Sequence, residues 1–173
     1  MHVSYQTGDP KALSRMIQKA QEINRRLVQV GVFDGYYAWL AGIHEYGCHI
    51  PVTPKMLAWL HYQGIHLKKS TTEIIIPERS FLRAGFDQKN EEVLSQIEAA
   101  LKQYLTSEET ADMVLKITGR NLASEIKKYA RDLHEPAKSS ASYQLGTRNS
   151  NPLVETGSMI AHITFQLDNG GGE

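Results

Sequence analysis

Residues 27–33 have the sequence Leu-Val-Gln-Val-Gly-Val-Phe, and this stretch decides the fold class. Val28, Val30 and Val32 would share one face of an extended chain, and β-branched residues favour a pleated surface, so the pattern predicts a β-strand. Leu27 and Phe33 fall on the opposite face, which indicates that both faces of the strand are at least partly covered. The strand therefore needs other elements packed against it.

Helical patterns flank this strand on both sides. Before it, Asp9-Pro10 has the features of a helix start, and apolar residues recur at helical spacing until Arg25-Arg26. After the turn pair Asp34-Gly35, a second helical pattern ends at Gly47, a residue type that commonly stops helices. We therefore expect an α+β protein with a small mixed or antiparallel sheet packed against several helices.

Length and composition exclude several classes of protein. The chain has 173 residues, a length typical of one domain, and we predict a single domain over residues 1-173. Its 19 Lys and Arg balance 19 Asp and Glu, so it lacks the net positive field that non-specific nucleic-acid binding uses. Cys48 is the one cysteine, which excludes an intramolecular disulfide and zinc sites built from paired Cys-x-x-Cys motifs. No stretch approaches the roughly 20 apolar residues of a membrane helix, and Met1 to Pro10 has no signal-peptide pattern, so we expect cytoplasmic synthesis and no membrane partner.

Residues 48–76 form a distinct block that we predict to be a helix-hairpin insertion. Thr53 can cap a short helix whose first turn contains Pro54. Apolar and polar residues alternate over residues 65–68, and residues 73–76 provide a second β-rich run across a polar turn, so a β-hairpin is the simplest interpretation. Lys68-Lys69 would then lie at the tip of the hairpin.

Two long helical patterns follow, the first beginning after Ser80. Thr106 and Glu109 have the spacing of a capping box, which predicts the start of the second helix, and we expect Gly119 to bend that helix.

Residues 136–152 differ in composition from the rest of the chain, because they are rich in Ser, Asn, Gly and Ala. Tyr143 and Leu145 are the sizeable apolar residues there, too few to order the segment, so we predict a long flexible arm. After it, alternating apolar residues from Ile160 to Leu167 predict a half-buried strand, and residues 168–173 predict a disordered tail.

The segment from His44 to His49 contains potential catalytic and metal-binding groups, but it fails the spacing tests. A zinc protease helix needs two histidines four positions apart, whereas Cys48 stands four positions after His44 and Gly47 would break the helix. A Cys48–His nucleophile and base pair stays possible, although nothing places a third orienting group. Phosphate-loop, dinucleotide and hydrolase-elbow motifs are absent, so we expect no enzyme, no catalytic residues, no metal and no cofactor.

Four basic residues, Lys68, Lys69, Arg79 and Arg83, could form a small phosphate-binding surface. Solvated charge is the simpler interpretation, and a small nucleic-acid-associated module is kept as the alternative function. Aromatic residues at helical spacing, Trp39 among them, and Tyr62 are interpreted as core rather than as a base-stacking platform.

Several segments, in this order from about Leu27 to Leu167, resemble tailed-phage virion morphogenesis proteins, the Mu-like and lambdoid minor tail, neck and tail-completion proteins. The segments are Val28-Gln-Val-Gly-Val-Phe-Asp-Gly, Ile43-His-Glu-Tyr-Gly47, Ile50-Pro-Val-Thr-Pro-Lys-Met56, Ile65-His-Leu67, Ile76-Pro-Glu-Arg-Ser-Phe-Leu-Arg83 and Asn151-Pro-Leu-Val-Glu-Thr-Gly157. The family more often has a proline where this chain has Ser80, and an aspartate where it has Glu155.

The resemblance implies a structural virion component that forms a homo-oligomeric, hexameric ring at the neck or tail end. Its implied partners are the tail tube, tail terminator and head-tail connector proteins, with passive contact to passing DNA. The candidate assembly or motif residues that it implies are Pro51, Pro54, Lys55, Met56, Lys68, Lys69, Pro77, Arg79, Phe81, Leu82, Arg83, Tyr143, Asn151, Pro152, Leu153, Thr156 and Gly157.

Overall fold

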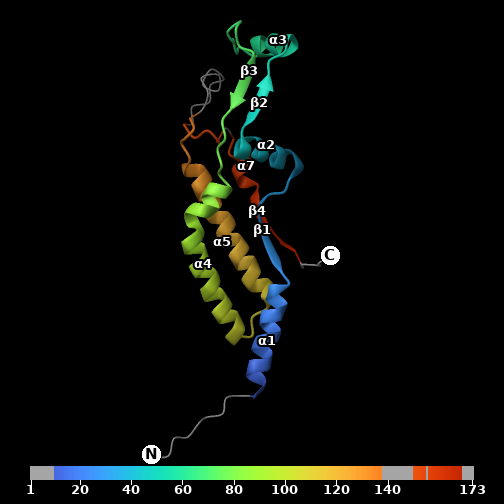
Figure 1. Cartoon of the computed structure of the whole chain (residues 1–173), viewed down its shortest axis with the longest axis vertical. Helices are drawn as coiled ribbons and strands as arrows, with labels where there is room; N and C mark the ends of the chain where they lie inside the picture. Colours follow the sequence, from blue (N-terminus) through green and yellow to red (C-terminus); the bar gives the residue numbers. More distant parts are fainter. Residues whose placement is uncertain (1–9, 138–149, 155, 169–173) are drawn as a thin grey trace, which may run out of the picture. The chain divides into compact units, whose positions relative to one another are not determined.

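The structure is a computed structural model that describes residues 10–137, 150–154 and 156–168. It shows an α+β fold, as the sequence predicts. The described elements, in chain order, are α1 (Pro10–Asn24), β1 (Leu27–Val32), α2 (Gly35–Tyr46), β2 (Cys48–Pro51), α3 (Pro54–Tyr62), β3 (Glu73–Ile76), α4 (Arg83–Thr106), α5 (Ala111–Asp132), α7 (Ser158–Ala161) and β4 (Ile163–Asp168) (Figure 1).

The chain divides into two compact units, and several elements run from one into the other. Unit 1 comprises Met1–Val30, Asn90–Leu122 and Phe165–Glu173, and unit 2 comprises Gly31–Lys89 and Ala123–Thr164. The expectation of one domain over residues 1-173 stays a prediction. The expected helix start at Asp9, most of the expected arm and the tail after Asp168 lie outside the described residues.

Unit 1 is built on α1 and on the parts of α4 and α5 that lie in it. Tyr104 and Ala111 have no exposed surface, and with Val114 they form a small core against which Ile23 of α1 packs. The Lys19 ammonium lies 4.8 Å from the centre of the Tyr104 ring and donates a hydrogen bond of 2.8 Å to the Tyr104 carbonyl oxygen. This polar and apolar contact holds α1 against the end of α4.

Gly119 lies inside α5, which continues through this position as one helix, and the expected bend stays a prediction. A Cβ atom at Gly119 would stand 2.5 Å from Cδ2 of Phe165 in β4. The missing side chain thus lets the aromatic ring of the strand lie directly on the helix backbone, the close approach for which glycine is suited.

The link between α4 and α5 also differs from the sequence prediction. Thr106 is the last residue of α4, and its hydroxyl donates to carbonyl oxygens of the preceding turn at 3.1 and 3.2 Å. Thr110 instead precedes α5, and its Oγ1 accepts from the Met113 amide at 3.4 Å. The predicted capping box at Thr106 is therefore wrong, because a second threonine four residues later takes the capping position.

Unit 2 contains an antiparallel ribbon of β2 and β3 with α3 at its far end from α2 (Figure 1). Cys48 pairs with Ile76, and Pro51 pairs with Glu73. The expected hairpin between residues 65–68 and 73–76 is therefore wrong: β3 is a strand, but its partner is β2. Ile65 instead folds back on α3, with its amide donating to the Leu60 carbonyl at 2.9 Å and its side chain buried.

The helix predictions around this ribbon are confirmed. Thr53 caps α3 as predicted, by accepting from the Met56 amide at 3.2 Å, and α2 follows the turn pair as expected. The structure adds that Asp34 caps α2 by accepting from the Tyr37 amide at 3.3 Å. The strand predicted from Ile160 is wrong in its start, because Ile160 belongs to the short helix α7 and β4 begins at Ile163.

Candidate assembly surface

The side chain of Glu45 organises the part of unit 2 where α2 ends and α4 begins. Only 3% of Glu45 is exposed, and its carboxylate accepts hydrogen bonds from the Ser80 hydroxyl, the Leu82 amide and the Arg83 amide, all within 3.0 Å. The amides of Leu82 and Arg83 stand at the start of α4, where backbone N–H groups have no helical partner. A carboxylate of one helix therefore caps the next, and its negative charge suits that position.

Arg83 extends this network to the surface. Its Nε donates to Glu45 at 3.0 Å, and its Nη2 donates to Glu78 at 2.7 Å. The guanidinium also lies 4.8 Å from the centre of the Tyr46 ring, a distance typical of a cation–π contact. The hydrogen bond to Glu45 is the main cause that raises the pKa of Arg83. Arg83 is thus held by two carboxylates and an aromatic ring.

Arg79 is buried, although its charge predicts an exposed position. It is 5% exposed, and its guanidinium donates to the carbonyl oxygens of Pro136 and Ala137, both at 2.8 Å. Its backbone amide donates to the His44 carbonyl at 2.7 Å. The interpretation of Arg79 as solvated charge is wrong, and its guanidinium cannot serve the phosphate-binding alternative while it holds residues 136 and 137.

Asn151 fixes the chain after residues 138–149, as Arg79 fixes the chain before them. It is 3% exposed, and its side-chain amide donates to the carbonyl oxygens of Ala130 and Arg131 at 2.9 and 2.6 Å, at the end of α5. Its Oδ1 accepts from the Leu153 amide at 2.7 Å. Both chain segments that flank residues 138–149 are therefore fixed to unit 2 by buried polar side chains.

The remaining candidate motif residues fall into two groups. Phe81, Pro152 and Leu153 are buried in unit 2, Gly157 precedes α7 with a φ of 77°, and the Thr156 hydroxyl donates to Ser158. The other group lies on β2, on α3 and on the segments next to β3. Its exposed members are Pro51, Pro54, Lys55, Lys68 and Lys69, and its half-buried members are Met56 and Pro77. Tyr143 lies outside the described residues.

The main feature that the sequence analysis misjudged is the outer face of α2. Tyr36, Trp39 and Tyr46 lie on one side of this helix by their spacing, and they are 65%, 63% and 69% exposed. The interpretation of Trp39 as a core residue is therefore wrong. We call these three side chains the α2 aromatic face.

The α2 aromatic face rests on a well-packed base. Tyr37, on the other side of the helix, stacks on His162 with a distance of 3.9 Å between ring centres. Ala41 and Glu45, also on the inner side, are each 3% exposed. The rings of Tyr36 and Trp39 lie 6.3 Å apart at an angle of 35°. The sequence signal that could have identified this face is that α2 carries large apolar residues around much of its circumference, more than one buried side can accommodate.

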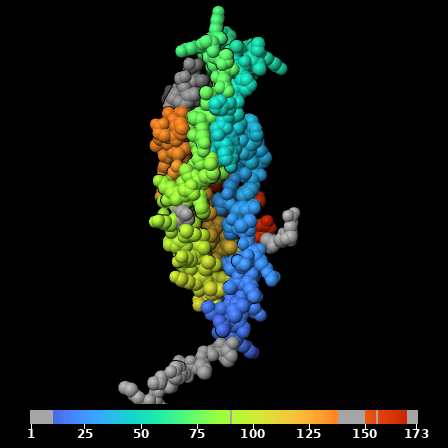
Figure 2. All heavy atoms as spheres, in the orientation of Figure 1, coloured from blue at the N-terminus to red at the C-terminus, as the bar shows by residue number. Residues whose placement is uncertain are grey.

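A second group of exposed aromatic residues lies on α3. Trp59 is 60% exposed and Tyr62 is 85% exposed, so the expectation that Tyr62 belongs to the core is wrong as well. Figure 2 shows side chains projecting into solvent at this end of the ribbon. Groups of neighbouring exposed apolar side chains often mark sites of interaction with other proteins.

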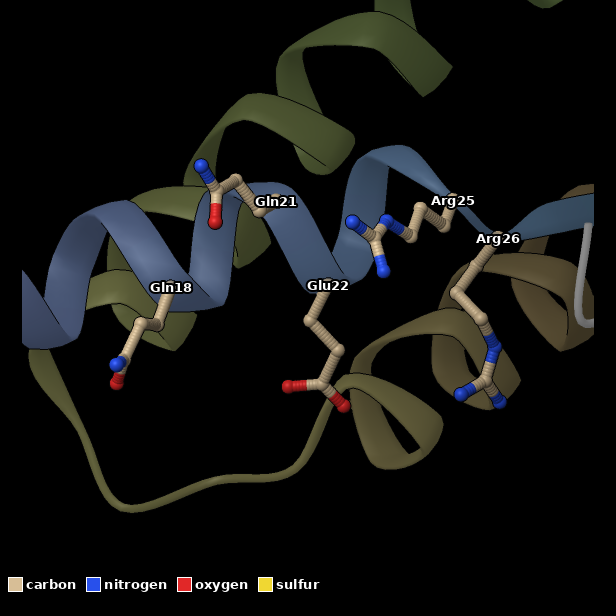
Figure 3. A pocket seen from close by; sticks show the side chains of 5 residues that line it. All are labelled: Gln18, Gln21, Glu22, Arg25 and Arg26. Atoms are coloured by element: carbon tan, nitrogen blue, oxygen red, sulfur yellow. The ribbon is translucent and has the colours of Figure 1, made fainter.

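A polar hollow of about 430 Å³ lies along α1 in unit 1, lined by Gln18, Gln21, Glu22, Arg25 and Arg26 (Figure 3). Glu22 and Arg26 extend to the same side of α1 (Figure 3), and both have partners. Arg26 pairs with Asp112, which lowers the pKa of that carboxyl, and Glu22 accepts from the Tyr104 hydroxyl at 3.0 Å. Burial, and then Glu22, raises the pKa of Tyr104 to about 12. These contacts join α1 to α4 and α5.

The structure also places the residues of the predicted Cys–His alternative. His44 is half-buried on α2, Cys48 is half-buried at the start of β2, and His49 Nδ1 lies 3.0 Å from Glu73 Oε1 across the ribbon. Among the described residues, no three His, Cys, Asp or Glu side chains gather as a metal site would require. Within the same ranges, no helix has the length and apolar character needed to cross a membrane.

Comparisons with models of known protein families, with curated proteins and with solved structures found no match to this chain.

His44 should make the protein sensitive to mild acid. Burial, together with the nearby charge of Arg79, lowers its pKa from 6.5 to about 4, and its Nδ1 is buried without a hydrogen-bond partner. The unfolded chain therefore binds the proton more tightly, so stability is lost as the pH falls from about 6.5 towards 4, by roughly 2–3 kcal/mol. We expect His44→Leu to reduce this loss when urea unfolding is measured from pH 7 to pH 4.5. An equal loss in both proteins would contradict this.

Proposed function

We propose that this protein is a structural component of a tailed-phage virion that completes the tail or neck and joins tail to head as an oligomeric ring. The observation that carries the proposal is the exposure of both tryptophans, Trp39 and Trp59, by 60% or more. The ordered motif segments described above, which resemble phage neck and tail-completion proteins, supply the class of assembly.

Exposed aromatic side chains have a clear energetic use in such an assembly. Burying one aromatic side chain removes about 150–250 Å² from water, and each Å² of apolar surface contributes roughly 25 cal/mol. Tyr and Trp are also the residues that most often dominate binding energy at protein interfaces. The α2 aromatic face, with Tyr36, Trp39 and Tyr46, can therefore provide the centre of a stable contact with another protein.

The motif residues fit this proposal as a scaffold for the exposed surface. Glu45, at the end of α2, holds Ser80, Leu82 and Arg83, so the α2 aromatic face and the start of α4 are fixed to each other. Arg79 fixes the chain that leads into residues 138–149, which we propose as an assembly arm. The ring meets a head-tail connector on one side and a tail tube or terminator on the other, because these are the neighbours of a neck or tail-completion protein.

Ring assembly is tested directly with the full-length protein and its tail partners. Light scattering should give a mass several times that of one chain, and electron microscopy should show rings or added density at tail ends. A protein that stays monomeric with these partners and never joins virions would remove the proposal.

The α2 aromatic face gives a sharper test of the same proposal. Trp39→Ser should change the free energy of unfolding by only about 0.5 kcal/mol, because the side chain is 63% exposed. It should weaken assembly at least about tenfold, the effect of losing roughly 1.4 kcal/mol of contact energy, as measured by light scattering across a dilution series.

Trp39→Phe is the matched control, because it keeps an aromatic ring at this position and should assemble like the parent protein. If Trp39→Ser assembles as well as Trp39→Phe, the α2 aromatic face is not an assembly contact.

A further inference from the structure

The strands β1 and β4 form a sheet of two strands, and among the described residues no third strand pairs with either of them. Each strand is six residues long. A two-stranded sheet leaves one row of backbone N–H and C=O groups on the outer side of each strand, and these rows are templates for another strand. Among the described residues, β1 and β4 thus each have one edge that pairs with no other strand.

Neither strand contains a proline or a lysine, two residue types with which proteins prevent strand pairing. β1 has the sequence Leu-Val-Gln-Val-Gly-Val, and β4 has Ile-Thr-Phe-Gln-Leu-Asp, with its one charged residue in the last position. The ribbon of unit 2 differs, because β2 ends in Pro51 and β3 begins with Glu73, which lies 3.0 Å from His49.

The burial pattern shows that one face of this sheet is packed and that the other is largely exposed. Within unit 1, Val28, Val30, Phe165 and Leu167 are half-buried, and Phe165 lies on the backbone of α5 at Gly119. On the other face, Gln29 and Gln166 are exposed and polar, and Leu27 is 51% exposed. A sheet of two strands is marginally stable by itself, so added strands would strengthen it without disturbing the packed face.

We propose that the β1 edge of one copy pairs with the β4 edge of the next copy, so that the sheet continues from copy to copy around the assembly. This inference rests on the proposed function, because a closed ring needs two unlike surfaces that repeat around an axis. β1 and β4 supply such a pair on one chain, and they match in length at six residues each. Pairing between two β1 edges would instead give a two-fold dimer and no ring.

Mixed disulfide cross-linking of the full-length protein tests this pairing. Cys48→Ala removes the native thiol, and single cysteines are then placed at exposed positions of β1 (L27C, Q29C) and of β4 (T164C, Q166C). Two positions are used on each strand, so that pairings between copies that differ by a shift of two residues are both tested. Directly opposite residues in paired strands have Cβ atoms about 4.5–5.5 Å apart, close to what a disulfide spans. Because each copy carries one cysteine, any disulfide must join two copies.

We expect a disulfide-linked dimer in at least one mixture of a β1 variant with a β4 variant, and much less of it in either variant alone. The matched control is Ser95→Cys, at an exposed position of α4 far from either strand in sequence, which should not cross-link above background. Amides of β1 and β4 should also exchange more slowly with deuterium in the assembled protein than at high dilution.

Two results would overturn the strand pairing. One is that a β1 variant alone forms as much disulfide-linked dimer as its mixture with a β4 variant, which would show that like edges pair. The other is the absence of cross-links in preparations that form rings, which would leave the proposed function intact. A chain that forms no assembly with its tail partners would instead refute the proposed function itself.

Discussion

Replacing Glu45 with alanine is expected to lower the free energy of unfolding by about 3 kcal/mol, because it removes a buried charged acceptor that several donors share. The donors are the Ser80 hydroxyl, the amides of Leu82 and Arg83, and the Arg83 guanidinium, with distances of 2.9–3.0 Å. The two amides would stay at the start of α4 without an acceptor. Urea unfolding followed by circular dichroism measures this change.

Glu78→Gln is the matched control for this variant. Glu78 also accepts from Arg83, at 2.7 Å, but its side chain is 55% exposed. Exposed ion pairs contribute roughly 0–1 kcal/mol, so this substitution should have a small effect. Glu45→Gln keeps the shape and one acceptor oxygen and should fall between the two. Equal effects of Glu45→Ala and Glu78→Gln would show that Glu45 does not organise this part of unit 2.

Replacing Gly47 with alanine should have a comparable or larger effect, at least about 3 kcal/mol, since it combines backbone strain with overpacking. Gly47 has a φ of 73° and a ψ of 169°, a region that is nearly exclusive to glycine. A Cβ atom there would also stand 2.9 Å from the Glu78 amide nitrogen and from the Ile76 carbonyl oxygen. Both contacts are backbone atoms and cannot move aside like the end of a flexible side chain.

Gly64 offers a control that separates the two causes. It has a φ of 83°, but a Cβ atom there would meet nothing within 4 Å. Gly64→Ala should therefore cost only about 1 kcal/mol, from backbone strain alone. Thermal unfolding of both variants, compared with the parent, measures the difference. If the two substitutions destabilise the protein equally, the contact with residues 76 and 78 is not what requires a glycine at position 47.

The elements that the sequence predicted correctly are those determined by local signals. Thr53 is a short polar residue in front of an apolar helical pattern, and it caps the helix that it was expected to cap. Gly47 ends α2 for the reason that its residue type suggests. These signals depend on residues within one helical turn, so they do not depend on contacts with distant parts of the chain.

The predictions that failed depend on partners far away in the sequence. Alternation over residues 65–68 is compatible with a strand, but it cannot show that residues 73–76 pair with Cys48–Pro51 instead. The charge of Arg79 predicts exposure, and only the carbonyl groups of residues 136 and 137, more than 50 positions away, allow it to be buried. Long-range contacts of this kind leave no trace in a local pattern.

The α2 aromatic face was also mispredicted, because Trp39 was expected to be buried and is exposed. Helical spacing around Trp39 predicts which residues share a side of α2, but it does not determine which side faces inward. The inner side is taken by Ala41 and by Glu45, whose burial depends on the donors of residues 80–83. A glutamate therefore occupies the position that the aromatic residues were expected to fill.

The exposure of both indole rings also determines what the intrinsic fluorescence of this protein can report. Since Trp39 and Trp59 are already largely surrounded by water in the single folded chain, denaturation changes their surroundings little, and their emission follows unfolding poorly. Contact with another subunit would transfer an indole into a drier environment and shift its emission to shorter wavelengths. The same two chromophores would thus act as a built-in, label-free optical sensor of association.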